Sequence, residues 1–220
     1  MPLDFALARE NMVENDVRTN DVTDRRLITA MRAIPREDFV PPAQREIAYG
    51  GLSVPLGGGR FLLEARCFSK LVQAAEIQPG DKVLDVGCGT GYSAAVLSRL
   101  AGQVIAVEED PALAQAAQRN LAVHGGGASV TIERGALNAG SPTQGPFDVI
   151  LFEGTIEEIP AEFVGQLRPE GRLLAVVASA GRLGRAMSFV RAGDGLSGRA
   201  LFDASVPPLP GFAKKRAFVF

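Results

Sequence analysis

Two hydrophobic patterns follow one another along the chain, and the first of them is helical. The first 45 residues predict two helices, because their apolar residues recur at helical spacing. One helix would bury Phe5, Met12, Val13 and Val17, and the other would bury Leu27, Ile28 and Met31 behind the capping residue Asp24. Prolines at positions 35, 41 and 42 end this part. Residues 50–60 hold five glycines and one proline and predict a loop, and residues 65–76 predict a third helix.

From Lys82 onward, short runs of β-branched residues alternate with helical segments. The expected strands are 82–86, 103–107, 129–133, 147–152 and 172–177, and the expected helices are 91–101, 111–123 and 161–167. Asp110 and Pro111 are typical of a helix start, and the glycines at 125–127 supply the stop. This alternation predicts a parallel sheet with helices on both faces.

The last part of the chain has strand-like patterns without helices between them. Segments 186–192, 199–206 and 213–220 follow one another directly, which predicts antiparallel strands at one edge of the sheet. The expected fold class is therefore α/β, a mostly parallel twisted sheet with antiparallel C-terminal strands and an N-terminal helical extension. At 220 residues we expect a single domain, with the extension and the glycine-rich loop in 1–78 and the sheet in 79–220.

Charge and composition argue against several classes of protein. The formal net charge is −2 and the isoelectric point about 5.6, so neither nucleic acid nor a membrane is an expected partner. Residues 182–220 carry 7 basic and 2 acidic side chains, and we assign them to the sheet rather than to a basic arm. Two cysteines and one histidine predict neither a disulfide scaffold nor a metal site. Charged residues at positions 4, 9 and 10 make the cytoplasm the expected location.

The most informative stretch is VLDVGCGTGY at residues 83–92, a glycine-rich turn after the first strand of the sheet. Alternating glycines let the chain turn tightly and let a ligand approach the main chain. The third glycine comes one residue earlier than in a dinucleotide fingerprint. Asp85 precedes the first glycine by two residues, where a carboxylate repels phosphate and suits a cationic ligand. Glu108 ends the next strand, where it can accept hydrogen bonds from ribose hydroxyls.

S-adenosylmethionine fits this pattern, because it carries an ammonium, a sulfonium and a ribose but no phosphate. It is the expected cofactor. The residues assigned to it here are Asp85, Gly87, Cys88, Gly89, Gly91 and Glu108. The side chains of Cys88 and Tyr92 are assigned to packing.

The chain also resembles the protein-L-isoaspartate O-methyltransferases over roughly residues 8–175. The matching segments are MVENDVR, AMRAIPREDFV, AY followed by PLGGG, VLDVGCGTGYSAAVL, PFDVIL and EIP. The resemblance implies a Rossmann-like methyltransferase domain. It also implies methyl transfer to the side-chain or α-carboxylate of isoaspartyl residues in damaged proteins, so that a protein or peptide is the expected partner. The sequence sets no oligomeric state.

The substrate loop departs from this family, in which it reads roughly G-x-G-Q-T-I-S-Q-P. Here the residues that follow the glycines are Arg60, Phe61, Leu62, Leu63 and Glu64. Phe61 therefore replaces a threonine, and Leu63 replaces a serine that by resemblance contacts the reacting carboxylate.

Two further family motifs are altered. Glu153 and Gly154 stand in place of part of V-T-A-A after the fourth strand. Ala136 and Leu137 stand in place of the last two residues of G-D-G after the third strand, which the resemblance associates with the adenosine side of the cofactor. These two residues therefore complete the expected cofactor-binding set.

Methyl transfer from a sulfonium depends mainly on positioning, and a carboxylate nucleophile is already ionised at neutral pH. We therefore expect no general base and assign no residue as catalytic. The acceptor side is assigned to Arg60, Phe61, Leu62, Leu63, Glu153 and Gly154. Arg60 could clamp a carboxylate bidentately, or it could form a solvated surface pair with Glu64.

Glu64 and Glu153 would make the acceptor side more negative than in the family, unless Arg60 or Arg66 pairs with one of them. We therefore expect weak methylation of ordinary isoaspartyl peptides. Two other functions stay open on the sequence alone. The chain could methylate another protein, a peptide or a small molecule, or it could bind the cofactor without catalysis and act through a partner.

Overall fold

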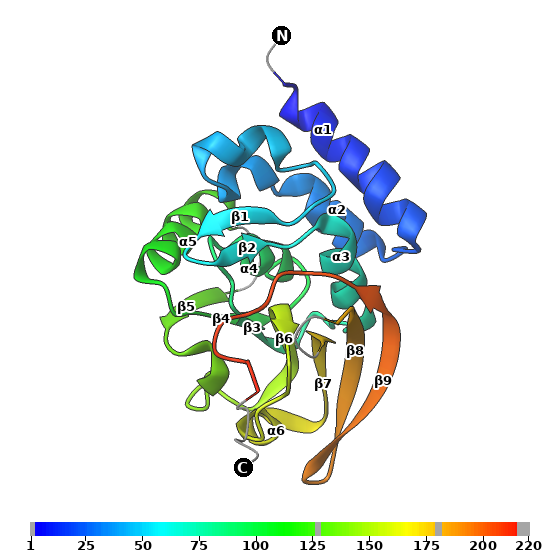
Figure 1. Ribbon diagram of the computed structural model, residues 1–220, viewed down its shortest axis with the longest axis vertical. Coiled ribbons are helices and arrows are strands. Elements are labelled where there is room, and N and C mark those ends of the chain that lie inside the picture. The colour runs from blue at the N-terminus through cyan, green and yellow to red at the C-terminus, as the bar shows by residue number, and fades with distance from the viewer. Residues whose placement is uncertain (1–2, 126–128, 179–181, 215–220) are drawn as a thin grey trace.

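The computed structural model describes residues 3–125, 129–178 and 182–214 (Figure 1). A seven-stranded sheet lies at its centre, in the order β5-β4-β3-β6-β7-β8-β9. The parallel strands are β3 (Lys82–Val86), β4 (Gln103–Glu108), β5 (Ser129–Arg134), β6 (Phe147–Ile156) and β7 (Leu167–Val177). The antiparallel edge consists of β8 (Gly184–Ala192) and β9 (Gly195–Ala204). The predicted fold class is confirmed.

The N-terminal extension is helical, as predicted. It consists of α1 (Phe5–Met12), a π-helical turn η1 (Val13–Val17), the short η2 (Arg18–Asn20), α2 (Arg25–Ala33) and the 3-10 turns η3 (Arg36–Phe39) and η4 (Pro42–Ile47). The Asp24 side chain accepts hydrogen bonds from the first backbone N–H groups of α2, which satisfies donors that have no partner within the helix. Helix α3 (Ala65–Ala74) follows and leads into the sheet.

Alternate residues of the central strands face opposite sides of the sheet, and both sides are covered. Val83 and Val149 point into a core formed with α2, α3, α4 (Tyr92–Leu97) and α5 (Pro111–His124). Leu84 and Ile150 point into a second core with Phe163 of α6 (Glu162–Gln166) and Leu137 of η5 (Leu137–Ala139). The central strands are therefore buried on both faces, as parallel strands usually are.

Residues 50–60 are not simply a loop, contrary to the sequence prediction. A two-stranded hairpin forms from β1 (Val54–Gly57) and β2 (Arg60–Leu62). Gly57, Gly58 and Gly59 have φ values of 98°, 57° and 73°, which only glycine adopts without strain. These glycines allow a reversal tight enough for the flanking residues to pair. In Figure 1 the hairpin lies beside α4 and α5, at the carboxyl ends of β3 and β4.

The segment after β9 crosses the carboxyl end of β6. The backbone N–H of Thr155 donates to the Pro207 carbonyl at 2.9 Å, and the N–H of Leu209 donates to the Thr155 carbonyl at 2.8 Å. The strand predicted over 199–206 begins earlier, at Gly195, and ends at Ala204. Of the strand predicted over 213–220, residues 213 and 214 are irregular and 215–220 lie outside the described residues.

Within the described ranges, no helix is long and apolar enough to cross a membrane. The same residues contain no group of histidine, cysteine and acidic side chains that could hold a metal ion.

A charge placed on the inner face of β8 tests whether this strand is an integral part of the domain. Ala186 is fully buried, whereas Val190 on the same strand is 39% exposed. We expect Ala186→Asp to lower the melting temperature by roughly 10 °C or more, because an unpaired charge enters the core. The matched control Val190→Asp should change it by only a few degrees. Equal melting temperatures for the two variants would contradict this packing.

Candidate cofactor and acceptor site

The chain leaves β3 toward β4 on one side and later returns to β6 on the other side of β3. In open α/β sheets, ligands bind at such a switch point, outside the carboxyl ends of the strands. The turn at 87–91 follows β3, Glu108 ends β4, and Glu153 lies near the end of β6. The structure therefore brings these predicted residues to one edge of the sheet. We call Asp85, the turn at 87–91 and Glu108 the cofactor cradle.

The first two glycines of the cradle stand where neighbouring side chains come very close. A Cβ on Gly87, at φ 86°, would lie 2.5 Å from Arg60 Nη2 and 2.7 Å from Leu209 Cδ1. A Cβ on Gly89, at φ 56°, would lie 2.7 Å from Leu56 Cδ1. The backbone conformation therefore favours glycine at both positions, and a side chain there would also displace the ends of Arg60, Leu209 or Leu56.

Gly91 is explained by helix packing instead. It precedes α4 at φ 92°, and a Cβ there would lie 3.1 Å from the Ala117 side chain on α5. Its glycine brings two helices together and keeps α4 next to the cradle. We keep Gly91 in the predicted cofactor set only for shaping the turn.

Asp85 is fully buried at the end of β3. One carboxylate oxygen accepts a hydrogen bond from the Ser93 hydroxyl at 2.6 Å. The other oxygen, Oδ1, is buried and has no partner among the described residues. The pKa of Asp85 is raised to about 7, mainly by burial; the hydrogen bond from Ser93 and the charge of Arg60 oppose this shift, and the nearby Glu108 carboxylate adds to it. A cationic group that reached Oδ1 would favour the ionised form.

Glu108 is also fully buried, and its carboxylate organises the surrounding backbone. Oε2 accepts a hydrogen bond from the N–H of Gly89 at 2.8 Å. Oε1 accepts from the N–H groups of Glu109 and Asp110 at 3.0 and 3.2 Å. Glu108, which we predict to bind the ribose, therefore also ties the glycine turn after β3 to the start of α5.

Arg60 lies inside the cradle, where the sequence did not place it. Its side chain is 2% exposed and its Nη2 lies 3.4 Å from Glu108 Oε2. The same nitrogen donates to the Gly87 carbonyl. The predicted solvated pair with Glu64 is wrong, because Glu64 pairs with Arg66 at 3.0 Å instead. Sequence spacing could not reveal this, since the hairpin carries Arg60 to a strand 48 residues away.

The rest of the predicted acceptor loop is largely packed into the core. Leu62 and Leu63 are 7% and 2% exposed, and only Phe61 is half-buried. The Leu63 side chain belongs to the same core as α3 and α4, and its carbonyl accepts a hydrogen bond from Arg36. Leu63 is therefore a structural residue here.

Glu153 and Gly154 lie beneath the C-terminal segment. Glu153 is 6% exposed, and burial raises its pKa well above the usual range, with Asp85 adding to the shift and Arg60 and Arg36 opposing it. A Cβ on Gly154 would lie 3.1 Å from both the Leu209 side chain and the Pro207 carbonyl. Glycine is therefore needed there for the segment to pass.

The remaining predicted cofactor residues meet the cradle less directly. Leu137 is fully buried in the second core, and Ala136 is exposed in the turn before it. Their assignment to the cofactor stays a prediction. Cys67 and Cys88 are both buried free thiols with raised pKa values, about 12 for Cys67, which agrees with a packing role.

A hollow of about 560 Å³ adjoins the cradle on the side of the C-terminal segment. We call it the acceptor hollow. It is lined mainly by Gly59, Thr155, Glu157, Arg182, Leu209 and Phe212. Leu209 separates it from Gly87, since this side chain borders both. Sequence reasoning missed the lining residues Leu209 and Phe212, because it expected strands over 199–206 and 213–220 and assigned no role to the PPLP run between them.

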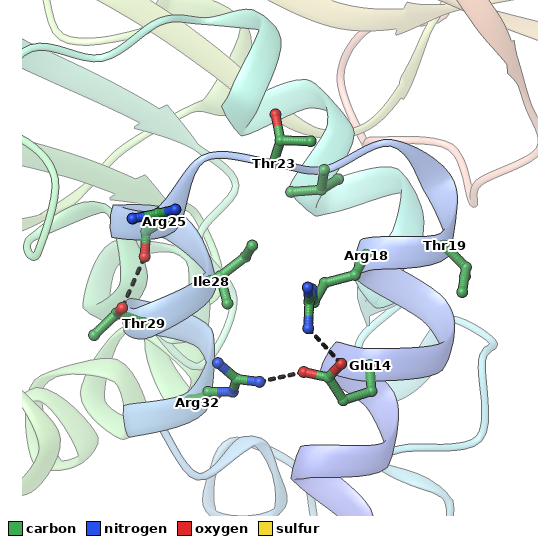
Figure 2. A pocket seen from close by; sticks show the side chains of 9 residues that line it. Glu14, Arg18, Thr19, Thr23, Arg25, Ile28, Thr29 and Arg32 are labelled. Carbon is green, nitrogen blue, oxygen red and sulfur yellow. Dashed lines mark hydrogen bonds and ion pairs between the residues drawn. The ribbon is translucent and has the colours of Figure 1, made fainter.

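A second hollow of about 690 Å³ lies between η1 and α2 (Figure 2). Arg32 of α2 pairs with Glu14 of η1 across it, Arg18 pairs with Glu14 one turn earlier on the same helical segment, and Thr29 donates to the Arg25 carbonyl. It shares no residue with the cradle. Two of its arginines are thus already paired, and we assign it no part in the reaction.

The residues of the cradle fit S-adenosylmethionine in chemical character. The unpartnered Oδ1 of Asp85 suits an ammonium, and Glu108 suits hydroxyl donors. The absence of a Cβ at Gly87 and Gly89 leaves the main chain open to close approach. The space beside Gly87 holds the Arg60 guanidinium.

Comparison with known proteins agrees with this geometry. Residues 7–201 match the family model "Protein-L-isoaspartate(D-aspartate) O-methyltransferase". A protein-L-isoaspartate O-methyltransferase of Methylorubrum extorquens is 40% identical over 178 residues, which cover 81% of this chain and 77% of that protein. One from a Roseiflexus species is 36% identical over 210 residues, covering 95% and 94%.

Solved structures show the same fold. A Plasmodium falciparum protein, described as a protein-L-isoaspartate O-methyltransferase in complex with S-adenosyl-L-homocysteine, superposes with a TM-score of 0.78. The match covers 91% of this chain and 97% of that one, at 18% identity.

The protonation of Asp85 predicts how ligand affinity depends on pH. Its ionised form should hold the ammonium of S-adenosylhomocysteine, so the measured Kd should rise by roughly tenfold for each pH unit below 7. Asp85→Asn should bind more weakly at pH 7.5 and lose most of this dependence. Isothermal titration calorimetry between pH 5.5 and 7.5 measures both. A wild-type pH profile that Asp85→Asn leaves unchanged would contradict the assignment.

The Asp85 carboxyl group also predicts how folding stability depends on pH. Its contribution to stability should fall as the pH rises, whereas ligand affinity should increase. Because the folded pKa lies above the unfolded value near 4, the native state binds the proton more tightly. This contribution to stability is complete below pH 4 and is lost as the pH rises through 7. Asp85→Asn should therefore melt at a higher temperature than wild type at pH 8. A lower melting temperature would show that the ionised carboxylate stabilises the fold.

Proposed function

The chain belongs to the protein-L-isoaspartate(D-aspartate) O-methyltransferase family, and we propose that it methylates an isoaspartyl carboxylate held in the acceptor hollow. It is an S-adenosylmethionine-dependent methyltransferase. The observation that carries the proposal is the pair of buried carboxylates, Asp85 and Glu108, on either side of a glycine turn. Such a pair favours a ligand with positive charge and hydroxyl groups and disfavours phosphate.

In this proposal the cofactor supplies a methyl group that its sulfonium makes electrophilic. Asp85 holds the ammonium, Glu108 accepts from the ribose hydroxyls, and the main chain at Gly87 and Gly89 borders the ligand. An acceptor carboxylate is already ionised at neutral pH, so the protein has to orient it and exclude water rather than remove a proton. Burial around Leu209 and Gly154 supports such exclusion.

The expected negative charge of the acceptor side is offset in two ways. Glu64 is paired with Arg66, which was one of the two alternatives considered from the sequence. Glu153 has a raised pKa because it is buried, so it ionises less readily than an exposed glutamate and repels an acceptor carboxylate less. These contacts weaken the electrostatic reason for expecting slow methylation of ordinary isoaspartyl peptides.

The loss of the family's serine remains a reason for a different acceptor. Leu63 replaces it and lies in the core, so this position has no side-chain donor for a carboxylate. A second candidate function is therefore methylation of another protein, peptide or small molecule. Donors for an isoaspartyl carboxylate would have to come from the main chain or from Arg60.

Transfer of a labelled methyl group tests the proposal. The protein is incubated with methyl-labelled S-adenosylmethionine and either an isoaspartyl peptide or the same peptide with ordinary aspartate. We expect label only on the isoaspartyl peptide, released as methanol by mild alkali as a methyl ester requires.

Two controls separate the alternatives. Label that appears only on a component of whole-cell extract would favour the second candidate acceptor. No label on either, together with normal binding of S-adenosylhomocysteine, would contradict methyl transfer and favour a protein that binds the cofactor without catalysis.

A further inference from the structure

Arg60 contacts two groups of the cofactor cradle, the Gly87 carbonyl and the Glu108 carboxylate. Its Nη2 donates to the Gly87 carbonyl and lies 3.4 Å from Glu108 Oε2. Its side chain is 2% exposed, and the Glu108 side chain is fully buried. The guanidinium thus fills the space directly against Gly87.

The guanidinium and the cofactor offer the same chemistry to the cradle. A guanidinium carries one positive charge and five N–H donors. In the proposed function, S-adenosylmethionine brings its ribose hydroxyls, which are also donors, to the same Glu108 carboxylate, and the main chain at Gly87 borders it. Nη2 lies 2.5 Å from the position of a Cβ on Gly87, so a ligand that comes against this side of the glycine has to displace the guanidinium.

Arg60 is also well placed to leave. It follows Gly59, which lines the acceptor hollow and stands at the end of three glycines with positive φ. The acceptor hollow therefore begins at the residue next to Arg60 in the chain. A guanidinium that leaves Gly87 for this hollow can bind a carboxylate bidentately, which is the preferred geometry of arginine with such a group.

We propose that Arg60 exchanges partners during the reaction: it competes with the cofactor for Glu108 and Gly87, is displaced when the cofactor binds, and then clamps the carboxylate of the acceptor. The inference rests on the proposed function for the identity of that acceptor. It makes cofactor and acceptor binding cooperative, because the acceptor binds to an arginine that only the cofactor releases.

Calorimetry with S-adenosylhomocysteine tests the competition without any turnover. Arg60→Met keeps much of the side-chain volume but removes the charge and the donors. We expect it to lower the Kd roughly tenfold or more, because the competing hydrogen bonds to a charged group are gone. The control Arg66→Met, at an arginine whose side chain is 52% exposed and lies outside the cradle, should leave the Kd unchanged. An unchanged or raised Kd in Arg60→Met would overturn the proposal.

Arginine-selective modification tests the exchange in the wild-type protein, so the proposal stays testable even where Arg60→Met does not fold. Phenylglyoxal followed by peptide mass spectrometry should leave Arg60 unmodified in the free protein. Saturating S-adenosylhomocysteine should make it reactive, while Arg36, which is 1% exposed and bound to main-chain carbonyls, stays protected as an internal control. Continued protection of Arg60 with ligand bound would overturn the displacement.

An isoaspartyl peptide added together with S-adenosylhomocysteine should protect Arg60 again, whereas the peptide alone should have no effect. In turnover assays Arg60→Met should raise KM for the peptide at least tenfold, with partial recovery in Arg60→Lys. If a peptide is methylated but never protects Arg60 from phenylglyoxal, the proposed binding of the acceptor carboxylate by Arg60 is overturned. If no isoaspartyl peptide is methylated while the cofactor analogue still exposes Arg60, the proposed acceptor is wrong and the competition stands.

Discussion

A buried carboxylate needs hydrogen-bond donors or a cation as partners, and the partners of Glu108 position several segments of this molecule. Its two oxygens accept three backbone hydrogen bonds, from Gly89 on one side and from the residues before α5 on the other. They also hold the Arg60 side chain and with it the β1–β2 hairpin. The glycine turn, the start of α5 and the hairpin are thus positioned around one charge. Removing it would leave the Arg60 guanidinium buried without its acidic partner, so the same residue supports the fold and the ligand site.

Local patterns in the sequence were sufficient to predict the parallel sheet and the glycine turn that follows β3. Strand 103–107 is apolar after its first residue, and the positive φ values of the turn glycines are what their spacing already indicates. The cap at Asp110 is likewise a local interaction, and it forms as predicted. What the sequence could not supply was the set of contacts between distant segments. Arg60 and Glu108 are 48 residues apart, and their pairing depends on a hairpin that the glycine content of 50–60 concealed.

On the acceptor side, too, the residue types could be read from the sequence, but the surroundings of each side chain could not. Leu63 and Glu153 were expected to change the chemistry of the pocket, because only their residue types were visible. In the folded chain Leu63 packs in the core, and burial raises the pKa of Glu153. The effect of a substitution therefore depends on how deeply the residue is buried. Alignment with a family motif gives no information on that burial. The acceptor hollow itself includes residues from 205–213 that no motif marked.

The crossing of β6 by the C-terminal segment has a consequence for the order in which the protein is made. Leu209 borders Gly87, yet translation adds it about 120 residues later. The cradle therefore lacks one wall for the whole time that the sheet strands are being synthesised. Gly154 and the apolar end of β6 remain uncovered until the segment leaves the ribosome. A nascent chain can build its sheet early, but a site closed on all sides belongs only to the finished polypeptide.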